Sequence, residues 1–360
     1  MIDLESLYLI PPYSMKKNEK KIFLTKELIQ LFKYHIIHCK EYGNMMKAID
    51  LNLDGISTYE ELPFIPVSLF KTLNLKSIND EDVFKTLTSS GTSGQTVSKI
   101  YLDKSSVIMQ QKTLVRIVKE FTGCYRLPML IIDSPSVIKN RSMFSARGAG
   151  ILGFSIFGSD RTFALNDEME IDFDSILTFL EKHKEEKILL FGFTFMIWQH
   201  FYKELLKSHI KLDLSKAVLI HGGGWKKLIS EAVSPLEFKE RLTDVCGLSD
   251  VHDYYGMVEQ TGCIYMQCQF GHLHASVFSD IIIRDPVDFS ICPIGKKGVI
   301  QVVSVLPRSY PGHSLLTEDE GCLLGEDDCP CGRKGKYFKV LGRLNNAEIR
   351  GCSDTYAAKF

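Results

Sequence analysis

The sequence predicts an α/β protein with a mostly parallel sheet flanked by helices and a β-rich C-terminal part. Short strand-like runs at 128–135, 187–193, 216–224 and 250–256 have Gly or Pro at or next to their ends, as short buried strands do. Amphipathic stretches of helical length separate them. Strand and helix in alternation favour a parallel sheet covered on both faces. From about residue 275, strand-like segments follow one another with little helix between them.

The remaining elements follow from spacing and turn residues. Residues 24–49 carry apolar residues at three and four spacing, which predicts an amphipathic helix packed on a larger body. The two prolines of PFIPVSLFKT indicate an extended entry to the alternating part. We therefore expect an N-terminal helical segment over 1–60, an α/β domain over 61–342 and a short tail over 343–360.

Composition excludes several classes of partner. The 43 basic and 44 acidic residues give a net charge of −1, and without like-charge blocks they form no footprint for nucleic acid or an anionic membrane. The N-terminus lacks a basic segment before a long apolar core, and the apolar run at 188–198 is too short to span a bilayer. We expect a soluble, unexported, cytoplasmic protein.

The ten cysteines of such a protein favour metal ligation or thiol chemistry over disulfides.

Residues 89–95 read SSGTSGQ, between the apolar stretch FKTL and the strand-like KIYLD. Gly91 and Gly94 permit a tight turn whose backbone N–H groups converge, so the loop is suited to cradle an anion such as a phosphate. Hydroxyl donors come from Ser89, Ser90, Thr92 and Ser93. The spacing differs from a Walker A motif, and an ordinary Ser/Gly turn is the alternative.

Four further motifs follow in order: HGGG at 221–224, YGMVEQTG at 255–262, LLTEDEG at 315–321 and VLGR at 340–343. With SSGTSG they resemble the adenylate-forming enzymes, the superfamily of acyl-CoA synthetases and luciferases, from about residue 60 to the C-terminus. The resemblance implies the large N-terminal-type domain of that superfamily, with ATP and Mg²⁺ as cofactors.

The resemblance also implies a role for each motif. The loop from Ser89 to Gly94 would hold the β- and γ-phosphates of ATP together with Lys99. Glu259 would help to bind Mg²⁺, which prefers oxygen ligands; the alternative is a solvated surface charge. The adenosine would be held by Gly222, Gly223, Gly224, Tyr255 and Gly256 around the adenine, by Asp319 on the ribose, and by Arg343 on ribose or phosphate. For Asp319 the alternative is a turn residue in an acidic stretch.

The C-terminal stretch AEIRGCSDTYAAKF places Cys352 beside Arg350, and a neighbouring cation favours a reactive thiolate. With PFIPVSLFKT and YYGMVEQTG, this stretch closely resembles the acyl-protein synthetases of bacterial luminescence operons. That resemblance implies that a fatty acid is activated as acyl-adenylate, that Cys352 accepts the acyl group, and that a partner acyl reductase receives it. The alternatives are a fatty- or aryl-acid CoA ligase of the phenylacetate type and a non-catalytic nucleotide-binding scaffold; Cys352 would then be an incidental cysteine.

After VLGR the chain departs from the wider superfamily. Leu344, Asn345 and Asn346 stand where most relatives carry aspartates before a mobile C-terminal domain. We expect that domain to be absent or vestigial, together with its late catalytic lysine. Lys99, Lys226 or Lys227 are candidates to compensate, whereas Lys359 gives no basis for a role.

A second set of residues suits a metal. Three thiols and an imidazole are typical of a closed tetrahedral zinc site, and the candidates are Cys268, His274, Cys329 and Cys331. The C-x-C spacing is tighter than the usual one, but it resembles a CPCGR segment of phenylacetate–CoA ligase relatives, some of which bind zinc. His272 is a competing ligand, and reduced free thiols are the alternative. A zinc ion here would fasten the β-rich part to the segment that carries Glu259.

Overall fold

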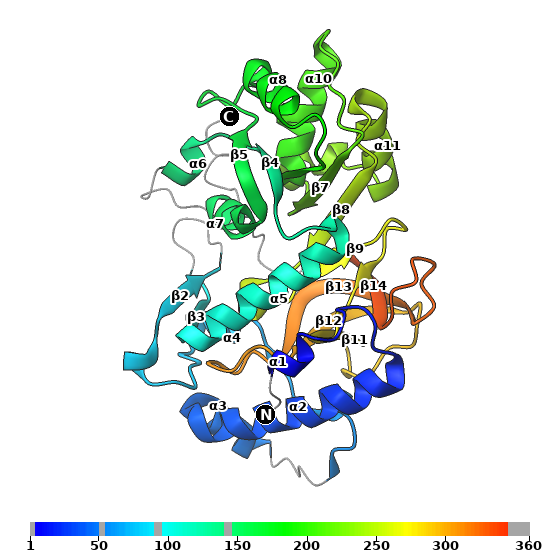
Figure 1. Cartoon of the computed structure of the whole chain (residues 1–360). Coiled ribbons are helices and arrows are strands. Elements are labelled where there is room, and N and C mark those ends of the chain that lie inside the picture. Colours follow the sequence, from blue (N-terminus) through cyan, green and yellow to red (C-terminus); the bar gives the residue numbers. More distant parts are fainter. Residues whose placement is uncertain (1–3, 50–54, 90–95, 140–145, 345–360) are drawn as a thin grey trace. The chain divides into compact units, whose positions relative to one another are not determined.

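The computed structural model describes residues 4–49, 55–89, 96–139 and 146–344 (Figure 1). They form two compact units. The first contains the described residues up to Ser89, those from 96 to Glu120 and those from Gly256 onward; the second contains those from Phe121 to Tyr255. The first unit thus joins segments that are distant in the sequence. The division at residues 60 and 342 stays a prediction.

The second unit is built on a parallel sheet with the strand order β8-β7-β6-β4-β5. All positions of β4, β6 and β7 are buried, as expected where helices cover both faces of a sheet. The predicted alternation of strand and helix is confirmed. The strands are β4 (Leu127–Ile132), β5 (Gly158–Phe163), β6 (Ile188–Phe193), β7 (Ala217–Gly222) and β8 (Asp250–Tyr255).

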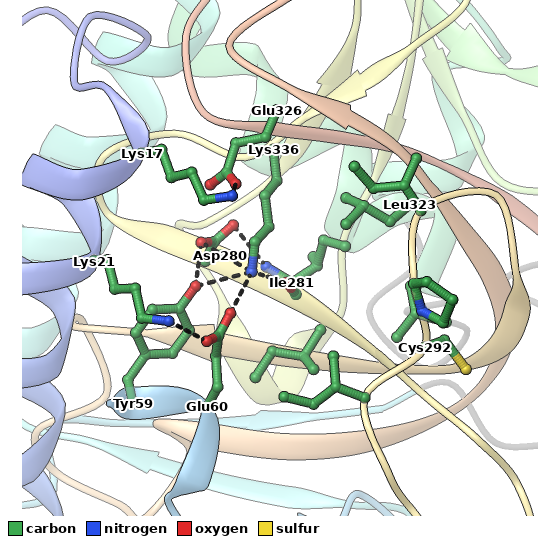
Figure 2. Close-up of a pocket in the computed structure, with 15 residues that line it drawn as sticks. Lys17, Lys21, Tyr59, Glu60, Asp280, Ile281, Cys292, Leu323, Glu326 and Lys336 are labelled. Atoms are coloured by element: carbon green, nitrogen blue, oxygen red, sulfur yellow. Dashed lines mark hydrogen bonds and ion pairs between the residues drawn. The ribbon is translucent and has the colours of Figure 1, made fainter. Parts of the chain in front are cut away.

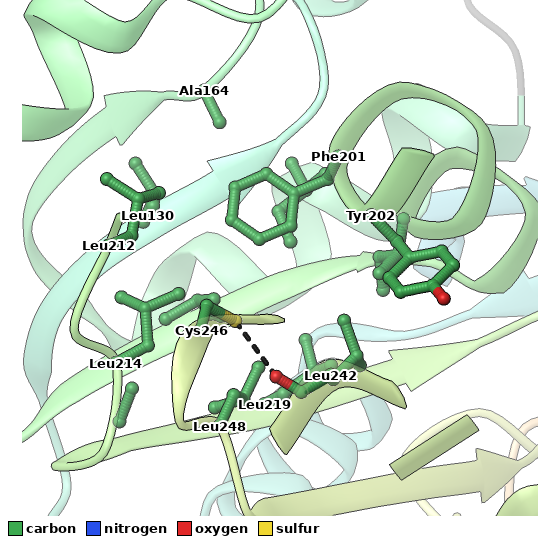
Figure 3. Close-up of a cluster of buried hydrophobic side chains, with 14 of the residues drawn as sticks. Leu130, Ala164, Phe201, Tyr202, Leu212, Leu214, Leu219, Leu242, Cys246 and Leu248 are labelled. Carbon is green, nitrogen blue, oxygen red and sulfur yellow. Dashed lines mark hydrogen bonds between the residues drawn. The ribbon is translucent and has the colours of Figure 1, made fainter. Parts of the chain in front are cut away.

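Helices pack on both faces of this sheet. On one face, Phe201 and Leu242 lie against Leu219 of β7 in a buried cluster (Figure 3). On the other, the Phe154 ring stacks on Phe191 of β6 with 4.3 Å between centroids. The helices are α6 (Ser136–Lys139), α7 (Ala146–Phe154), α8 (Phe173–Lys182), α9 (Thr194–Met196), a π-helical turn (Ile197–Tyr202), α10 (Lys203–Lys207) and α11 (Pro235–Cys246).

The first unit holds an antiparallel sheet with the order β11-β12-β13-β14-β10-β9. Its strands confirm the predicted β-rich C-terminal part. The extended entry at PFIP forms β1 (Ile65–Pro66), which pairs in parallel with β13. The other strands are β9 (Tyr265–Gln267), β10 (Leu273–His274), β11 (Ser279–Arg284), β12 (Lys297–Ser304), β13 (Ser314–Glu326) and β14 (Lys336–Arg343).

The helix expected over 24–49 differs in its bounds. It begins at Lys17 and is divided at Cys39, whose backbone is extended, into α2 (Lys17–His38) and α3 (Lys40–Ala48). A Cβ at Gly43 would lie 2.5 Å from the Ile36 carbonyl oxygen, so glycine permits this close turn. The other helices are α1 (Leu4–Leu7), α4 (Leu69–Thr72) and α5 (Lys104–Thr122). Within the described ranges, no helix has both the length and the apolar character needed to cross a bilayer.

Buried charges fasten α2 to the sheet of the first unit. Lys20 and Asp280 are both 2% exposed, with 3.5 Å between Nζ and Oδ1. The Lys336 ammonium donates to the Tyr59 hydroxyl and to Glu60, and the Tyr59 hydroxyl donates to Asp280 at 2.6 Å (Figure 2). Burial alone would raise the pKa of Asp280, but the two lysines hold it below its usual value. The network borders a pocket of about 280 Å³, which none of the predicted nucleotide-binding residues lines.

Replacing Asp280 by asparagine is expected to lower the free energy of unfolding at neutral pH by about 3–5 kcal/mol, because it leaves buried cations without their partner. The pKa of an aspartate in the unfolded chain is about 3.9. The pKa of Asp280 in the folded protein lies below that value. Its contribution is therefore present above the unfolded pKa and lost as pH falls through the folded pKa. Denaturant unfolding at several pH values should show the difference between wild type and variant shrinking in acid.

The matched control for this change is Asp80→Asn. Asp80 pairs with Lys76 on the surface, and its side chain is 96% exposed, so the expected loss is below about 1 kcal/mol. Equal losses for the two variants would contradict a stabilising role for the buried network.

Candidate active site and candidate metal centre

The predicted phosphate loop connects the two strands of a hairpin. β2 (Lys85–Thr88) pairs antiparallel with β3 (Lys99–Leu102), and Thr88 lies opposite Lys99. The Ser89 N–H donates to the Ser98 carbonyl at 3.1 Å, and the Ser89 hydroxyl accepts from the Ser98 N–H at 2.9 Å. These bonds close the neck of the hairpin and leave Lys99 exposed at its end. Ser90, Gly91, Thr92, Ser93 and Gly94 lie outside the described residues.

Glu259 is buried rather than solvated. It lies in a single turn (Val258–Gln260) and is 5% exposed. Burial raises the pKa of its carboxyl, and Glu318 adds to the rise, whereas the Ser98 hydroxyl and Arg343 lower it. Burying a carboxylate is costly unless a cation offsets its charge. The geometry therefore excludes the surface-charge alternative and suits a bound divalent cation.

Asp319 and Arg343 lie opposite each other on β13 and β14. The Arg343 guanidinium is 3.7 Å from an Asp319 carboxylate oxygen and 3.8 Å from one of Glu318. Asp319 belongs to a paired strand, so it is not a turn residue. These distances are long for charge-assisted hydrogen bonds, so the two residues are close neighbours across the paired strands.

The predicted adenine-binding residues follow two neighbouring strands of the second unit. β7 ends at Gly222, which pairs with Tyr254, and β8 ends at Tyr255. A Cβ at Gly222 would lie 2.5 Å from the Tyr254 ring, and Gly223 has a φ of +74°, so both positions require glycine. Gly224 has open space around it. The carboxyl ends of adjacent parallel strands are where α/β sheets bind ligands.

The structure brings part of the predicted site together. Ser89, Lys99, Glu259, Asp319 and Arg343 belong to the first unit, as does Gly256. Gly222, Gly223, Gly224 and Tyr255 belong to the second unit. Cys352 lies outside the described residues, as do the side chains of Lys226 and Lys227. These roles stay predictions.

Sequence reasoning missed Ser98 and Glu318, which lie near Glu259. The only signal in the sequence was that each immediately precedes a residue with a predicted role: Ser98 precedes Lys99, and Glu318 precedes Asp319. Ser98 belongs to none of the motifs, and Glu318 lies within LLTEDEG without an expected role. Only folding brings them close to a carboxylate that is far away in the sequence.

The four predicted zinc ligands come from three segments of the first unit. Cys268 follows β9, His274 ends β10, and Cys329 and Cys331 lie in the turn between β13 and β14. Their ligand atoms lie within 4.8 Å of one another. The Cys268 and Cys329 sulfurs are 4.0 Å apart, and the Cys331 sulfur is 3.3 Å from His274 Nε2.

These distances fit a tetrahedral zinc ion. Zn–S bonds of about 2.3 Å place two sulfurs about 3.8 Å apart, whereas a disulfide requires about 2.05 Å. Burial, with the nearby Arg333 cation, lowers the pKa of His274 to about 3, so the imidazole is in its neutral, ligand form. His272 Nδ1 is 3.3 Å from the Cys329 sulfur, but His272 is not one of the four grouped ligands.

Residues 4–360 match the protein family described as acyl-protein synthetase, LuxE. The chain belongs to the acyl-protein synthetase family. It is therefore an acid–thiol ligase of the adenylate-forming, AMP-producing kind, as the sequence motifs predicted.

Individual proteins show the same relationship over nearly the whole chain. This synthetase is 23% identical over 357 residues to the long-chain-fatty-acid–luciferin-component ligase of Aliivibrio fischeri, covering 96% of this chain and 91% of that protein. It is 20% identical over 366 residues to the ligase of the same name from Vibrio harveyi, covering 98% and 92%.

Solved structures confirm the predicted fold. An open conformation of 2-hydroxyisobutyryl-CoA ligase, in complex with 2-HIB-AMP and CoA, matches with a TM-score of 0.71 at 15% identity, over 94% of this chain and 78% of that chain. The same ligase in its postadenylation state matches with a TM-score of 0.70 at 14% identity, over 94% and 71%. The acyl-protein synthetase thus shares the fold of adenylate-forming CoA ligases.

Proposed function

We propose that this acyl-protein synthetase activates a long-chain fatty acid with ATP as acyl-adenylate and transfers the acyl group to its own Cys352, from which a partner acyl reductase receives it. The observation that carries this proposal is the family match, which runs to residue 360 and so includes the segment RGCSDTY. The names of two relatives, both ligases of long-chain fatty acids, support the choice of acid over an aryl acid.

In the first half-reaction, a carboxylate oxygen of the fatty acid attacks the α-phosphorus of ATP. The bond from that phosphorus to the bridging oxygen breaks, and pyrophosphate leaves. The protein's part is to orient the reactants and to neutralise charge. The hairpin loop and Lys99 would hold the outgoing phosphates, while Asp319 and Arg343 would hold the ribose.

Mg²⁺ would offset the negative charge of the phosphates during this step. Glu259 would hold this ion, because its carboxylate is buried and its raised pKa indicates that the nearby cations do not fully offset burial. The carboxylate supplies the hard oxygen ligand that Mg²⁺ prefers.

In the second half-reaction, the Cys352 thiolate attacks the acyl carbon of the adenylate. The bond from that carbon to the phosphate oxygen breaks, AMP leaves, and a thioester forms. Arg350, two residues before Cys352, favours the thiolate over the thiol. The thioester keeps the acyl group activated for the reductase.

The zinc site would have a structural role. Cys268, His274, Cys329 and Cys331 would fill all four positions of a tetrahedron, which leaves none for a substrate. A bound ion would join the β9–β10 segment, which follows Glu259 in the chain, to the turn between β13 and β14.

Intact-protein mass spectrometry tests the proposed reaction. The protein is incubated with ATP, Mg²⁺ and a mixture of fatty and aryl acids, without CoA. A hydroxylamine-labile adduct with the mass of a long-chain acyl group is the expected result. No adduct, but acyl-CoA once CoA is added, would identify a CoA ligase instead. ATP binding without acid-dependent pyrophosphate release would identify a non-catalytic scaffold.

Replacing Glu259 by glutamine should impair both pyrophosphate release and acylation by more than about 100-fold, since losing even outer partners of a metal ligand costs up to that amount. Acid-dependent pyrophosphate release, measured over a range of Mg²⁺ concentrations, checks this. Glu81→Gln, an exposed residue of the same unit, is the control and should behave as wild type. An unimpaired Glu259→Gln variant would contradict the assignment.

A further inference from the structure

Residues 309–313 form a turn between β12 and β13 that contacts the backbone of Glu259. The Tyr310 hydroxyl donates to the Glu259 carbonyl oxygen at 2.9 Å. In the opposite direction, the Gln260 side-chain amide donates to the Gly312 carbonyl oxygen at 2.9 Å. Two side chains thus join the turn at 309–313 to the turn that carries Glu259.

These contacts are completely enclosed. Tyr310 is 0% exposed, and its ring packs edge-on against Phe70 of α4. A Cβ at Gly312 would clash with the Tyr310 ring and lie 2.9 Å from the Glu259 carbonyl oxygen, so only glycine permits this approach. Burial, with the nearby Glu259 carboxylate, keeps the pKa of Tyr310 well above its usual value, and its hydroxyl therefore remains a hydrogen-bond donor at any physiological pH.

The same turn also contacts the strand that leaves the phosphate loop. The Ser309 hydroxyl donates to the Tyr101 carbonyl oxygen at 2.9 Å. Tyr101 lies on β3, two residues after Lys99. Adjacent residues of one short turn therefore hold the backbone at Glu259 and the strand that begins with Lys99.

The turn is itself anchored on the N-terminal helices. The His313 ring stacks on His35 of α2 with 5.1 Å between centroids, and both imidazoles are fully buried. His35 Nδ1 and the Ser77 hydroxyl share a hydrogen bond of 2.7 Å. The Ser77 N–H donates to the Ser309 carbonyl oxygen at 2.8 Å. These contacts join the turn at 309–313 to α2 and to Ser77.

We infer that Tyr310 is a positioning residue, which fixes the Glu259 backbone so that the Glu259 carboxylate meets the divalent cation. Ser309 is a second positioning residue, which fixes the strand that begins with Lys99. The inference rests on the proposed function of Glu259. Its physical basis is preorganisation: groups that bind developing charge act best when neighbouring residues already hold them in place. Both residues would act through the backbone carbonyls to which they donate, those of Glu259 and Tyr101.

The test uses Tyr310→Phe, which removes one hydroxyl and keeps the buried ring. We expect the Mg²⁺ concentration for half-maximal pyrophosphate release to rise about fivefold, the size expected for one neutral hydrogen bond. The matched control is Tyr265→Phe, because the buried Tyr265 hydroxyl also donates to a carbonyl, that of Asp280, in the same unit. It should lower the melting temperature to a similar extent and leave the Mg²⁺ requirement unchanged.

Ser309→Ala provides a second, independent measurement. It should raise the KM for ATP about fivefold and leave the Mg²⁺ requirement unchanged. The inference is overturned if Tyr310→Phe and Tyr265→Phe show the same Mg²⁺ requirement, or if Ser309→Ala leaves the KM for ATP as in wild type. Glu259→Gln, assayed in parallel, distinguishes failure of the inference from failure of the proposed function. If that variant is fully active, the proposed role of Glu259 is wrong, and the inference about Tyr310 is wrong with it.

Discussion

Replacing Cys352 by serine is expected to abolish the hydroxylamine-labile acyl adduct while acid-dependent pyrophosphate formation continues. The groups that we propose for adenylation lie elsewhere in the chain, so the first half-reaction does not need the thiol. A hydroxyl is a far weaker nucleophile than a thiolate at neutral pH, and the adenylate then has no acceptor. Mass spectrometry of the intact protein and a pyrophosphate assay measure the two halves separately.

Cys124→Ser is the matched control for this change. Cys124 is an exposed cysteine of the described chain, and its variant should acquire the adduct as wild type does. An adduct that persists on the Cys352→Ser variant would place the acceptor at another residue. Loss of the adduct from both variants would show that acylation depends on Cys124 as well, so that it would no longer identify Cys352 as the acceptor.

Replacing Cys329 by serine, or removing metal with a chelator, should lower the melting temperature by roughly 5 °C. Loss of a structural metal is among the few changes that cost about 4 kcal/mol or more, and with an unfolding entropy of about 2.1 cal/mol/K per residue each kcal/mol corresponds to about 1.3 °C for a chain of 360 residues. Because all four positions would be filled by protein, the chemistry should be affected only through stability. Elemental analysis and thermal unfolding check both statements.

The control for Cys329→Ser is Cys322→Ser in the same unit. Cys322 is also buried, at 3% exposure, but it is not one of the grouped ligands, so its variant should keep the metal. Protein purified free of zinc, with a melting temperature that chelation does not change, would refute the zinc site and favour reduced thiols.

The buried strands of the parallel sheet could be predicted, because the signal for each strand lies in its own residues. β4, β6 and β7 are short, continuous apolar runs that end in polar or glycine residues, and burial on both faces requires that composition. The start of α11 also has local signals, although it was not predicted, because a single helix was expected across this point: Ser234 caps α11 by accepting from the Glu237 N–H, and Pro235 occupies its first turn.

Other features could not be read, because they depend on contacts between distant segments. Nothing in PFIP indicates that Ile65 would pair with Leu315. The division between α2 and α3 depends on the close contact of Gly43 with the Ile36 backbone. Lys20 looks like a surface lysine in an amphipathic helix, yet it is buried against Asp280, 260 positions away by their numbers.

For the candidate site, the sequence by itself determined the residue types: a loop of glycines and hydroxyls, a lone carboxylate, three thiols with an imidazole, and a cysteine beside an arginine. Only the tertiary structure decided that Glu259 is buried, that His274 rather than His272 joins the three sulfurs, and that Tyr310 holds the Glu259 backbone. The physical reason is that a side chain's chemistry is set by its type, whereas its burial, pKa and partners arise from segments that meet only when the chain is folded.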